Sequence, residues 1–435
     1  MMACYPNARL LLAAALSLLL SACATDRPLE TACPALERFT YPHLGETPPP
    51  EATPAPVATA SVPGGSPLLH RGPITLPYAA NDNEPPTDSM DRALQQAYQA
   101  PDNTAQPVQP RYSDALILSG GGQWGAYGAG VLSGWSIHGR LPARIVTGIS
   151  TGALQATFAY LGDDKGLVEA YSIKDERQLA IRYGNGFFLR HASTADIAPL
   201  KSYIRERVGP LIPAVAAEYR QSGRTLLVGA VDGLTGQFHV IDLTKIAVDS
   251  KLTDAQRLDC YSAGLLASAA VPVIFRQVSI NGRPWLDGGV RHALFLPEII
   301  RRISAARTAN ARAGYPSVAT DGTVWAVKNG VTSIDELPAL PAQLLPTILR
   351  LRTIVFDEIE ANSLDLAAYQ ASKRGLRLYA ATADGWDKSG LPECRDVKPG
   401  VEDAIFDPAF MRCLLSYGEG RWLNGKTPWV LHEPS

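Results

Sequence analysis

The stretch Val146–Gly152 constrains this 435-residue chain more than any other, because it has the pattern of a sharp turn from a strand into a helix. Ala143–Val146 has the apolar character of a buried strand, and Ala153–Leu161 has the small and apolar residues of a helix. Ser150 lies between them in the pattern G-x-S-x-G, in which the glycines let the backbone bend tightly. The following helix N-terminus favours negative charge beside the serine hydroxyl. This pattern predicts a nucleophile elbow, although an ordinary strand–turn–helix with a small serine also fits it.

The composition is that of a globular protein with one large or two ordinary domains. Hydrophobic residues make up 46% of the chain and charged residues 19%, which is enough for a sizeable core. The formal net charge is −2 and no long basic run occurs, so nucleic-acid binding has little support. The six cysteines are too widely spaced for C-x-x-C ligand pairs, and H-E-x-x-H is absent from the sequence. We therefore expect neither a metal site nor a cofactor.

Residues 1–22 have the pattern of a secretory signal. Arg9 is followed by the apolar run Leu10–Leu20, which is too short to cross a bilayer as a mature helix. The residues Leu20-Ser21-Ala22-Cys23 resemble the lipobox of bacterial lipoproteins, which implies cleavage before Cys23 and attachment of lipid to it. Ala24 follows instead of aspartate, so we expect an outer-membrane lipoprotein that faces the periplasm. A secreted protein with a chance cysteine at the cleavage site is the alternative.

Residues 23–112 are rich in Pro, Ala, Thr and Asn. Such a composition buries too little apolar surface to offset the entropy of ordering, so it predicts a partly extended tether with an optional short helix at Met90–Gln99. From Asp114 onward, predicted strands alternate with helices, which indicates a largely parallel sheet covered on both faces. We find no second linker and expect residues 113–435 to form one domain with a C-terminal extension.

A glycine-rich loop, Ser119–Gly125, follows the first predicted strand of this domain and opens its first helix. The loop also satisfies the pattern G-x-G-x-x-G of dinucleotide-binding proteins, but no Asp or Glu lies between Gly125 and Gly162 to hold a ribose hydroxyl. A P-loop is excluded because no Gly-Lys-Ser/Thr follows. The better interpretation is a rigid loop whose exposed N–H groups stabilise the oxyanion of an acyl-transfer intermediate.

A serine nucleophile requires a base, and the most distinctive candidate is Asp287. In Leu286-Asp287-Gly288-Gly289 a strand ends in two glycines that leave the carboxylate unobstructed. A carboxylate partly removed from water beside a serine can accept the hydroxyl proton directly. A plain Asp-Gly-Gly turn would also fit. Among the seven histidines none has a recognisable catalytic setting, although His292 keeps a Ser–His–Asp triad open as a rival.

In order, spacing and flanking residues, the three motifs resemble those of the patatin-like phospholipases over about Ala115–Val290. Leu118–Gly122 resembles the oxyanion loop of that family, Gly148–Gly152 its nucleophile elbow, Leu286–Gly289 its base, and Ala267–Pro272 the helix end that precedes the base. The resemblance implies a three-layer α/β/α fold of the α/β class with a mostly parallel central sheet. It also implies a lipase or phospholipase that cleaves acyl esters of membrane lipids or related amphiphiles.

The same resemblance implies a role for each matching residue. Ser150 attacks, Asp287 takes and returns its proton without a histidine, and the amides of Gly120, Gly121 and Gly122 hold the oxyanion. A catalytically degenerate envelope lipoprotein with a binding or scaffold role is the competing hypothesis. The joint presence of Ser150 and Asp287 argues against it.

One position departs from the family pattern. Many members have Arg or Lys where this chain has Trp124, so we expect no strong pairing with a lipid phosphate and weak head-group discrimination. Trp124 is expected either to line an acyl channel or to pack the first helix against the sheet.

The C-terminal extension carries two further features. A helix predicted from about Thr347 to Ser372 has one apolar face, which is either part of the core or able to meet a membrane. The residues of this face are Ile348, Leu351, Val355 and Ile359. Cys394 and Cys413 are candidates for a disulfide in an oxidising periplasm.

Overall fold

The computed structural model describes residues 27–34, 36–42, 89–99, 112–184, 191–295, 297–315, 318–334, 336, 339, 344–397 and 405–433. The predicted signal peptide at residues 1–22 and the predicted lipid-attachment residue Cys23 lie outside the described residues.

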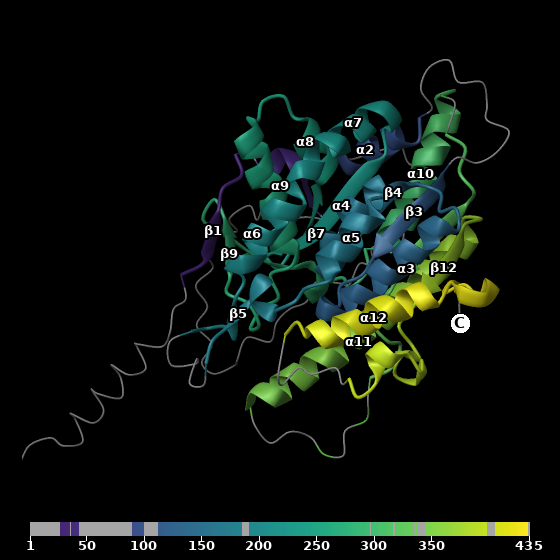
Figure 1. Cartoon of the computed structure of the whole chain (residues 1–435). Coiled ribbons are helices and arrows are strands. Elements are labelled where there is room, and N and C mark those ends of the chain that lie inside the picture. Colours follow the sequence, from purple (N-terminus) through teal and green to yellow (C-terminus); the bar gives the residue numbers. More distant parts are fainter. Residues whose placement is uncertain are drawn as a thin grey trace, which may run out of the picture.

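The centre of the domain is a twisted sheet whose middle strands run parallel (Figure 1). In spatial order these strands are β7 (Thr225–Asp232), β4 (Ala143–Ile149), β3 (Ser113–Leu118), β11 (Thr323–Val327) and β12 (Arg377–Ala381). Strands β4, β3 and β7 are continuously buried, as expected for parallel strands covered on both faces. The prediction of an α/β fold with a mostly parallel central sheet is confirmed.

Shorter strands, most of them antiparallel to their neighbours, complete the sheet at its edges. They are β1 (Leu29–Thr31), β2 (Thr40–Pro42), β8 (Phe238–Asp242), β9 (Val278–Ile280), β10 (Arg283–Asp287) and β13 (Val430–Leu431). A separate two-stranded ribbon pairs β5 (Ile181–Arg182) with β6 (Ala195–Asp196).

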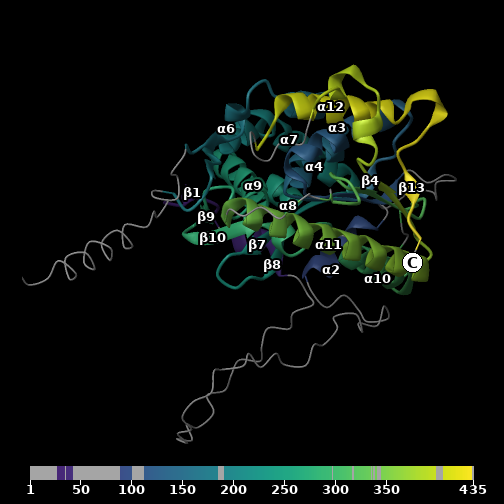
Figure 2. The ribbon, with the colours of Figure 1, turned by 90° about the horizontal axis from the view of Figure 1, so that it is seen from below.

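Helices cover both faces of the sheet, which gives the three predicted layers (Figures 1 and 2). One face carries α3 (Gly125–Ile137), α4 (Thr151–Leu161), α5 (Asp164–Tyr171), α6 (Ala198–Arg207), α7 (Ile212–Ser222), α8 (Leu243–Val248), α9 (Asp254–Ser268) and α12 (Pro408–Gly420). The other carries α2 (Ser89–Ala97), α10 (Pro297–Arg312) and α11 (Leu344–Lys373). Neighbouring strand residues enter opposite cores: Leu116 packs with the first set and Ile117 with the second.

Single turns of 3-10 helix occur at several connections. They are η1 (Leu36–Phe39), η2 (Gly122–Trp124), η3 (Glu176–Gln178), η5 (Gly209–Leu211), η6 (Gly288–Val290), η7 (Trp386–Lys388), η8 (Pro392–Cys394) and η9 (Leu423–Gly425). Of these, η2 lies within the glycine loop and η6 directly follows Asp287.

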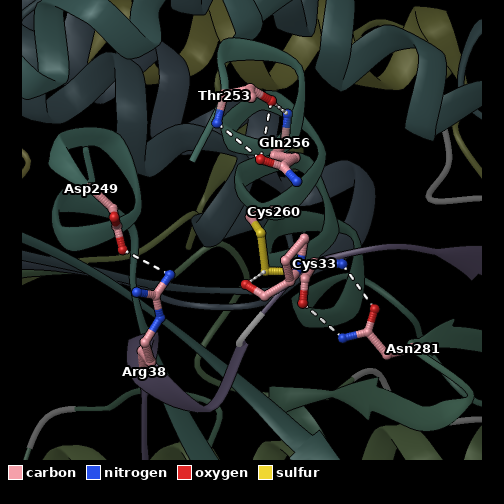
Figure 3. Close-up of a disulfide and its surroundings, with 8 residues drawn as sticks. Cys33, Arg38, Asp249, Thr253, Gln256, Cys260 and Asn281 are labelled. Atoms are coloured by element: carbon pink, nitrogen blue, oxygen red, sulfur yellow. Dashed lines mark hydrogen bonds and ion pairs between the residues drawn. A yellow bond between two sulfur atoms is a disulfide. The ribbon is translucent and has the colours of Figure 1, made fainter. Parts of the chain in front are cut away.

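The tether predicted for residues 23–112 is wrong for the segment from β1 to β2. Strand β1 pairs with β9, and β2 pairs with β8. Between them, Cys33 forms a disulfide with Cys260 of α9, and Asn281 exchanges hydrogen bonds of 3.0 and 2.7 Å with the Cys33 backbone (Figure 3). An ion pair of 3.0 Å joins Arg38 to Asp249. Strand pairing and a disulfide hold this segment in place. A prediction from the content of apolar residues alone therefore missed that the segment is ordered.

A second part of the predicted tether is also ordered. The optional helix at Met90–Gln99 is confirmed as α2, which packs against α10 with Leu94 and Tyr98 fully buried. Its Asp91 forms an ion pair with Arg302, a buried residue of α10. The ion pair and the buried side chains attach α2 to α10, so α2 is part of the domain.

The C-terminal extension also belongs to the domain. It supplies the central strands β11 and β12 and the helix α12, which packs along α3. Cys394 and Cys413, which the sequence left as a candidate pair, form a disulfide that ties η8 to α12. Among the helices that the structure describes, none has both the length and the apolarity that a membrane span requires.

Candidate active site

Ser150 lies on the predicted turn between β4 and α4. Its backbone has φ 55° and ψ −124°, a conformation that side-chain-bearing residues rarely adopt and that costs on the order of 1–3 kcal/mol. The flanking glycines are required sterically: a Cβ on Gly152 would overlap the carbonyl oxygen of Leu118, and one on Gly148 would overlap the backbone of Gly152. The close approach of β3, β4 and α4 therefore fixes the direction of the serine.

A second serine holds this turn in place. The Ser150 N–H donates to Oγ of Ser268 at 3.0 Å, and the Ser268 hydroxyl donates to the carbonyl of Gly229 at 2.6 Å. Ser268 is the last residue of α9 and is fully buried. One hydroxyl thus connects the strained turn to strand β7 and satisfies two buried backbone groups. Ser268 lies in the segment Ala267–Pro272 that the sequence singled out, but its hydrogen bonds were not predictable.

The sheet topology brings Asp287 to the same place. Strand β4 ends with Ile149 opposite Gly229, and β10 ends with Asp287 opposite Ala230, the next residue of β7. Strand β8 occupies one edge of β7, along residues that also pair with β4 or with β10. Strands β4 and β10 therefore both lie along the opposite edge of β7. They run toward each other along it. Ser150 and Asp287 therefore meet where the two strands end, both largely buried at 7% and 1% exposure.

The turn after Asp287 fixes its carboxylate. The amide of Gly289 donates to Oδ1 at 2.7 Å, while the Asp287 N–H donates to the carbonyl of Ala270 at 3.0 Å. Both glycines are needed. A Cβ on Gly289 would lie 2.9 Å from the carboxylate oxygen, and one on Gly288 would lie 2.5 Å from the carbonyl oxygen of Gly229. The Asp-Gly-Gly sequence thus permits a buried carboxylate held by a backbone amide.

The glycine loop lies against the serine, since a Cβ on Gly120 would be 3.3 Å from Cβ of Ser150. The Gly120 N–H donates to the carbonyl of Ala293 at 3.3 Å. Gly121 and Gly122 have φ values of 141° and 57°, and within the described part of the chain their amides donate no hydrogen bond. Of the three predicted oxyanion donors, the amides of Gly121 and Gly122 are therefore available to an oxyanion. The amide of Gly120 already donates to a carbonyl.

A buried polar network supports this loop from below, and the sequence did not predict it. The Asn329 side chain donates to the Ser119 carbonyl at 2.8 Å and to Oε1 of Gln155 at 3.0 Å. The Asn329 N–H donates to the Ser119 hydroxyl at 2.8 Å, which itself donates to the Gly120 carbonyl at 2.7 Å. A Cβ on Gly121 would overlap the Asn329 carbonyl. The network fixes the backbone from which the loop amides project.

Lys328, which precedes Asn329, is the buried cation beside this network. Its Nζ lies 3.2 Å from Glu360 and 3.5 Å from Asp357, both on α11. Burial raises the pKa of Glu360, against the opposing effects of Lys328 and of a hydrogen bond with Ser119. Lys328 is therefore paired with carboxylates and is not free for a lipid phosphate. The polar pair 328–329 directly after an apolar strand was the available sequence signal, because parallel strands place such residues at the site edge.

Trp124 packs with aromatic residues of the C-terminal region. Its ring lies edge-on to Phe410 at 4.9 Å and to Trp386 at 6.0 Å. Both contacts come from the C-terminal extension, and neither comes from the sheet. The structure therefore gives Trp124 a packing role against α12 and η7 in place of the expected packing against the sheet, and the apolar pocket described below is lined by other residues.

His292, the base of the rival triad, lies in the loop after η6. Its backbone N–H donates to the Gly288 carbonyl at 3.0 Å, and its ring lies edge-on to Phe238 with the ring centroids 4.8 Å apart. The triad stays a hypothesis to be tested by substitution. No group of His, Cys, Asp or Glu within the described ranges could hold a metal ion.

The apolar face of α11 is largely exposed in its first half. Leu351 and Val355 are 55% and 52% exposed and Ile348 is 38% exposed, while Ile359 is half-buried. The expectation that this stripe belongs to the core is therefore wrong for its first three residues. An exposed apolar surface of this kind is typical of contact with a lipid surface or another partner.

Comparison with known proteins identifies a family domain within the chain. Residues 116–299 match the family model of the patatin-like phospholipases. The crystal structure of VipD from Legionella pneumophila is similar at 12% identity and a TM-score of 0.31, over 72% of this chain and 69% of that one. A search of curated proteins found no match. The chain thus contains a patatin-like phospholipase domain at residues 116–299, with the patatin fold.

Proposed function

We propose that this protein is a serine acyl hydrolase that cleaves membrane-lipid acyl esters with a Ser150–Asp287 dyad. Its family supports lipid acyl hydrolysis in general terms. The observation that carries the residue assignment is that β4 and β10 end opposite consecutive residues of β7, so that the residues at these two strand ends are neighbours. The strained backbone of Ser150 adds support, since strain of this kind clusters at functional sites.

The chemistry follows from these groups. Ser150 Oγ attacks the ester carbonyl as Asp287 accepts its proton. The amides of Gly121 and Gly122 and the N-terminus of α4 stabilise the negative charge on the former carbonyl oxygen. Asp287 then returns the proton to the departing alcohol, which leaves an acyl-serine. A water molecule gives its proton to Asp287, attacks the acyl-serine and releases the fatty acid, and the proton returns to Ser150.

The charges around the loop suggest little head-group discrimination. Trp124 occupies the position of the family cation and is packed among aromatic rings. Lys328 is buried and paired with Asp357 and Glu360. Neutral and phosphate-bearing acyl esters should therefore be cleaved at comparable rates.

We also propose that the enzyme is anchored at the outer membrane through lipidated Cys23 and faces the periplasm. Two disulfides support an oxidising compartment, and the exposed apolar residues of α11 support work at a lipid surface. Cys23→Ser should abolish incorporation of labelled palmitate in growing bacteria. Wild-type protein found unlabelled in the soluble periplasmic fraction would contradict the anchor.

The catalytic proposal is tested with Ser150→Ala. Hydrolysis of a dodecanoate ester should fall by at least about 10⁴-fold, because the nucleophile is lost. Ser202→Ala, on the exposed side of α6, is the matched control and should keep full activity. Equal melting temperatures would show that both variants fold. Substantial hydrolysis by folded Ser150→Ala would refute the assignment.

A further inference from the structure

An apolar pocket lies beside the proposed nucleophile. Gly122 of the glycine loop and Thr151, the residue after Ser150, form part of its lining, so one end of the pocket lies next to the loop and the elbow. Along α4 the lining runs from Thr151 to Phe158, about 10 Å of helix. Further walls come from α5, α6 and α12, through residues that include Ala170, Ile204 and Met411.

Most polar groups in these walls are already engaged, and the exception among the described residues is the buried Nε of Arg207, which has no hydrogen-bond partner. The Tyr171 hydroxyl lies 2.8 Å from both the carbonyl and the hydroxyl oxygen of Thr151. The Tyr203 hydroxyl donates to the carbonyl of Ala170 at 3.1 Å. The guanidinium of Arg207 pairs with Glu169 at 3.5 Å. A polar ligand would lose hydrogen bonds to water with little replacement here, whereas a hydrocarbon chain would lose none.

We propose that this pocket binds the acyl chain of the ester and makes the enzyme selective for long hydrocarbon chains over short ones. The inference rests on the proposed function, since it places the ester carbonyl at Ser150. Phe406 and Met411, which help to line the pocket, lie beyond the family match at residues 116–299. The C-terminal part of this chain therefore contributes to acyl-chain selection.

Binding is measured first without turnover, by calorimetry of dodecanoate with Ser150→Ala protein. Adding Ala170→Phe fills the pocket from α5, and Leu154→Trp fills it independently from α4. Each methylene group of the ligand that can no longer be buried lowers the affinity about fourfold. Exclusion of two methylene groups should therefore weaken dodecanoate binding by at least about tenfold. Ala217→Phe, the same change at an exposed alanine of α7, should bind as the parent does. Equal dodecanoate affinity in all folded variants would overturn the inference.

Turnover separates this inference from the proposed function. Wild-type kcat/KM should be higher for dodecanoate than for butanoate esters. Ala170→Phe should lose that preference, whereas Ala217→Phe should keep it. Hydrolysis of both esters by wild type at equal kcat/KM would overturn the pocket inference and leave the dyad standing. Tight dodecanoate binding that the filling variants weaken, without hydrolysis by wild type, would refute the proposed function and support the pocket.

Discussion

Two regions meet at the site, and the chain encodes them differently. The glycine loop and the elbow lie within Ser119–Gly152 and hold the proposed nucleophile and oxyanion donors in short motifs. The region from β11 to α12 supplies none of the proposed reacting groups, yet Asn329 supports the loop and Met411 lines the pocket. The difference teaches that local backbone geometry positions the proposed reacting groups. Packing between side chains far apart in the sequence aligns those groups and shapes the pocket proposed for the substrate.

The largest effect is expected at Asp287, the proposed base for the nucleophile of the first region. Asp287→Asn should lower kcat/KM for a dodecanoate ester by about 10²–10⁴-fold, because an amide cannot accept the serine proton. His292→Ala is the paired variant and should retain most of the rate. The reverse ranking, with a loss of about 10³-fold or more for His292→Ala, would replace the dyad by a triad.

A smaller loss of activity is expected from the second region. Asn329→Asp keeps the shape but cannot donate to the Ser119 carbonyl, so the loop amides should be aimed less well. We predict a fall in kcat of about tenfold with KM little changed, below the 10²–10³-fold typical of losing an oxyanion donor outright. Steady-state kinetics normalised by active-site titration checks this.

Asn362→Asp, at an exposed position of α11, is the control for that change. A purely structural role for Asn329 would lower the melting temperature and the fraction of active enzyme, with kcat per active site unchanged. That result would show that the second region contributes to stability and not to catalysis.

The disulfides should affect stability and leave the chemistry nearly unchanged. The bond between Cys33 and Cys260 spans 227 residues and that between Cys394 and Cys413 spans 19. In the chain-entropy account, removing the first by paired Cys→Ser changes should cost about 2 kcal/mol more in unfolding free energy than removing the second. Urea unfolding measures both. Equal losses would show that native packing, rather than loop length, determines their contributions.

The smallest effect on specificity is expected at Trp124. Trp124→Arg should lower the melting temperature, because each aromatic pair with Phe410 and Trp386 is worth about 0.5–1.5 kcal/mol beyond burial. The ratio of phospholipid to neutral-ester hydrolysis should not change. A clear shift of this ratio toward phospholipids would show that position 124 faces the head group and would extend the first region's role to specificity.

The sequence predicted the parts of the site that depend on local backbone geometry. The elbow at Ser150 and the turn at Asp287 require glycines at fixed spacing, and the structure shows what a Cβ there would strike. The alternation of strands and helices likewise predicted the three layers. Such features can be predicted from the sequence because they depend on residues close together in the chain.

What the sequence could not predict depends on distant partners. The hydrogen bonds of Ser268 and Asn329 join strands and helices far apart in the chain, and either residue could equally be an ordinary buried polar group. The segment from β1 to β2 was predicted as tether because its composition is poor in apolar residues. Its order comes from strand pairing and from the bond between Cys33 and Cys260, whose partner is 227 residues away.

The most direct test is the site of covalent modification by a fluorophosphonate bearing an alkyl chain. Mature protein should gain one adduct, mapped by peptide mass spectrometry to Ser150, and Asp287→Asn should react far more slowly. An adduct on a different serine, or failure of folded protein to react under conditions that label a known serine hydrolase, would contradict the assignment of Ser150 as nucleophile.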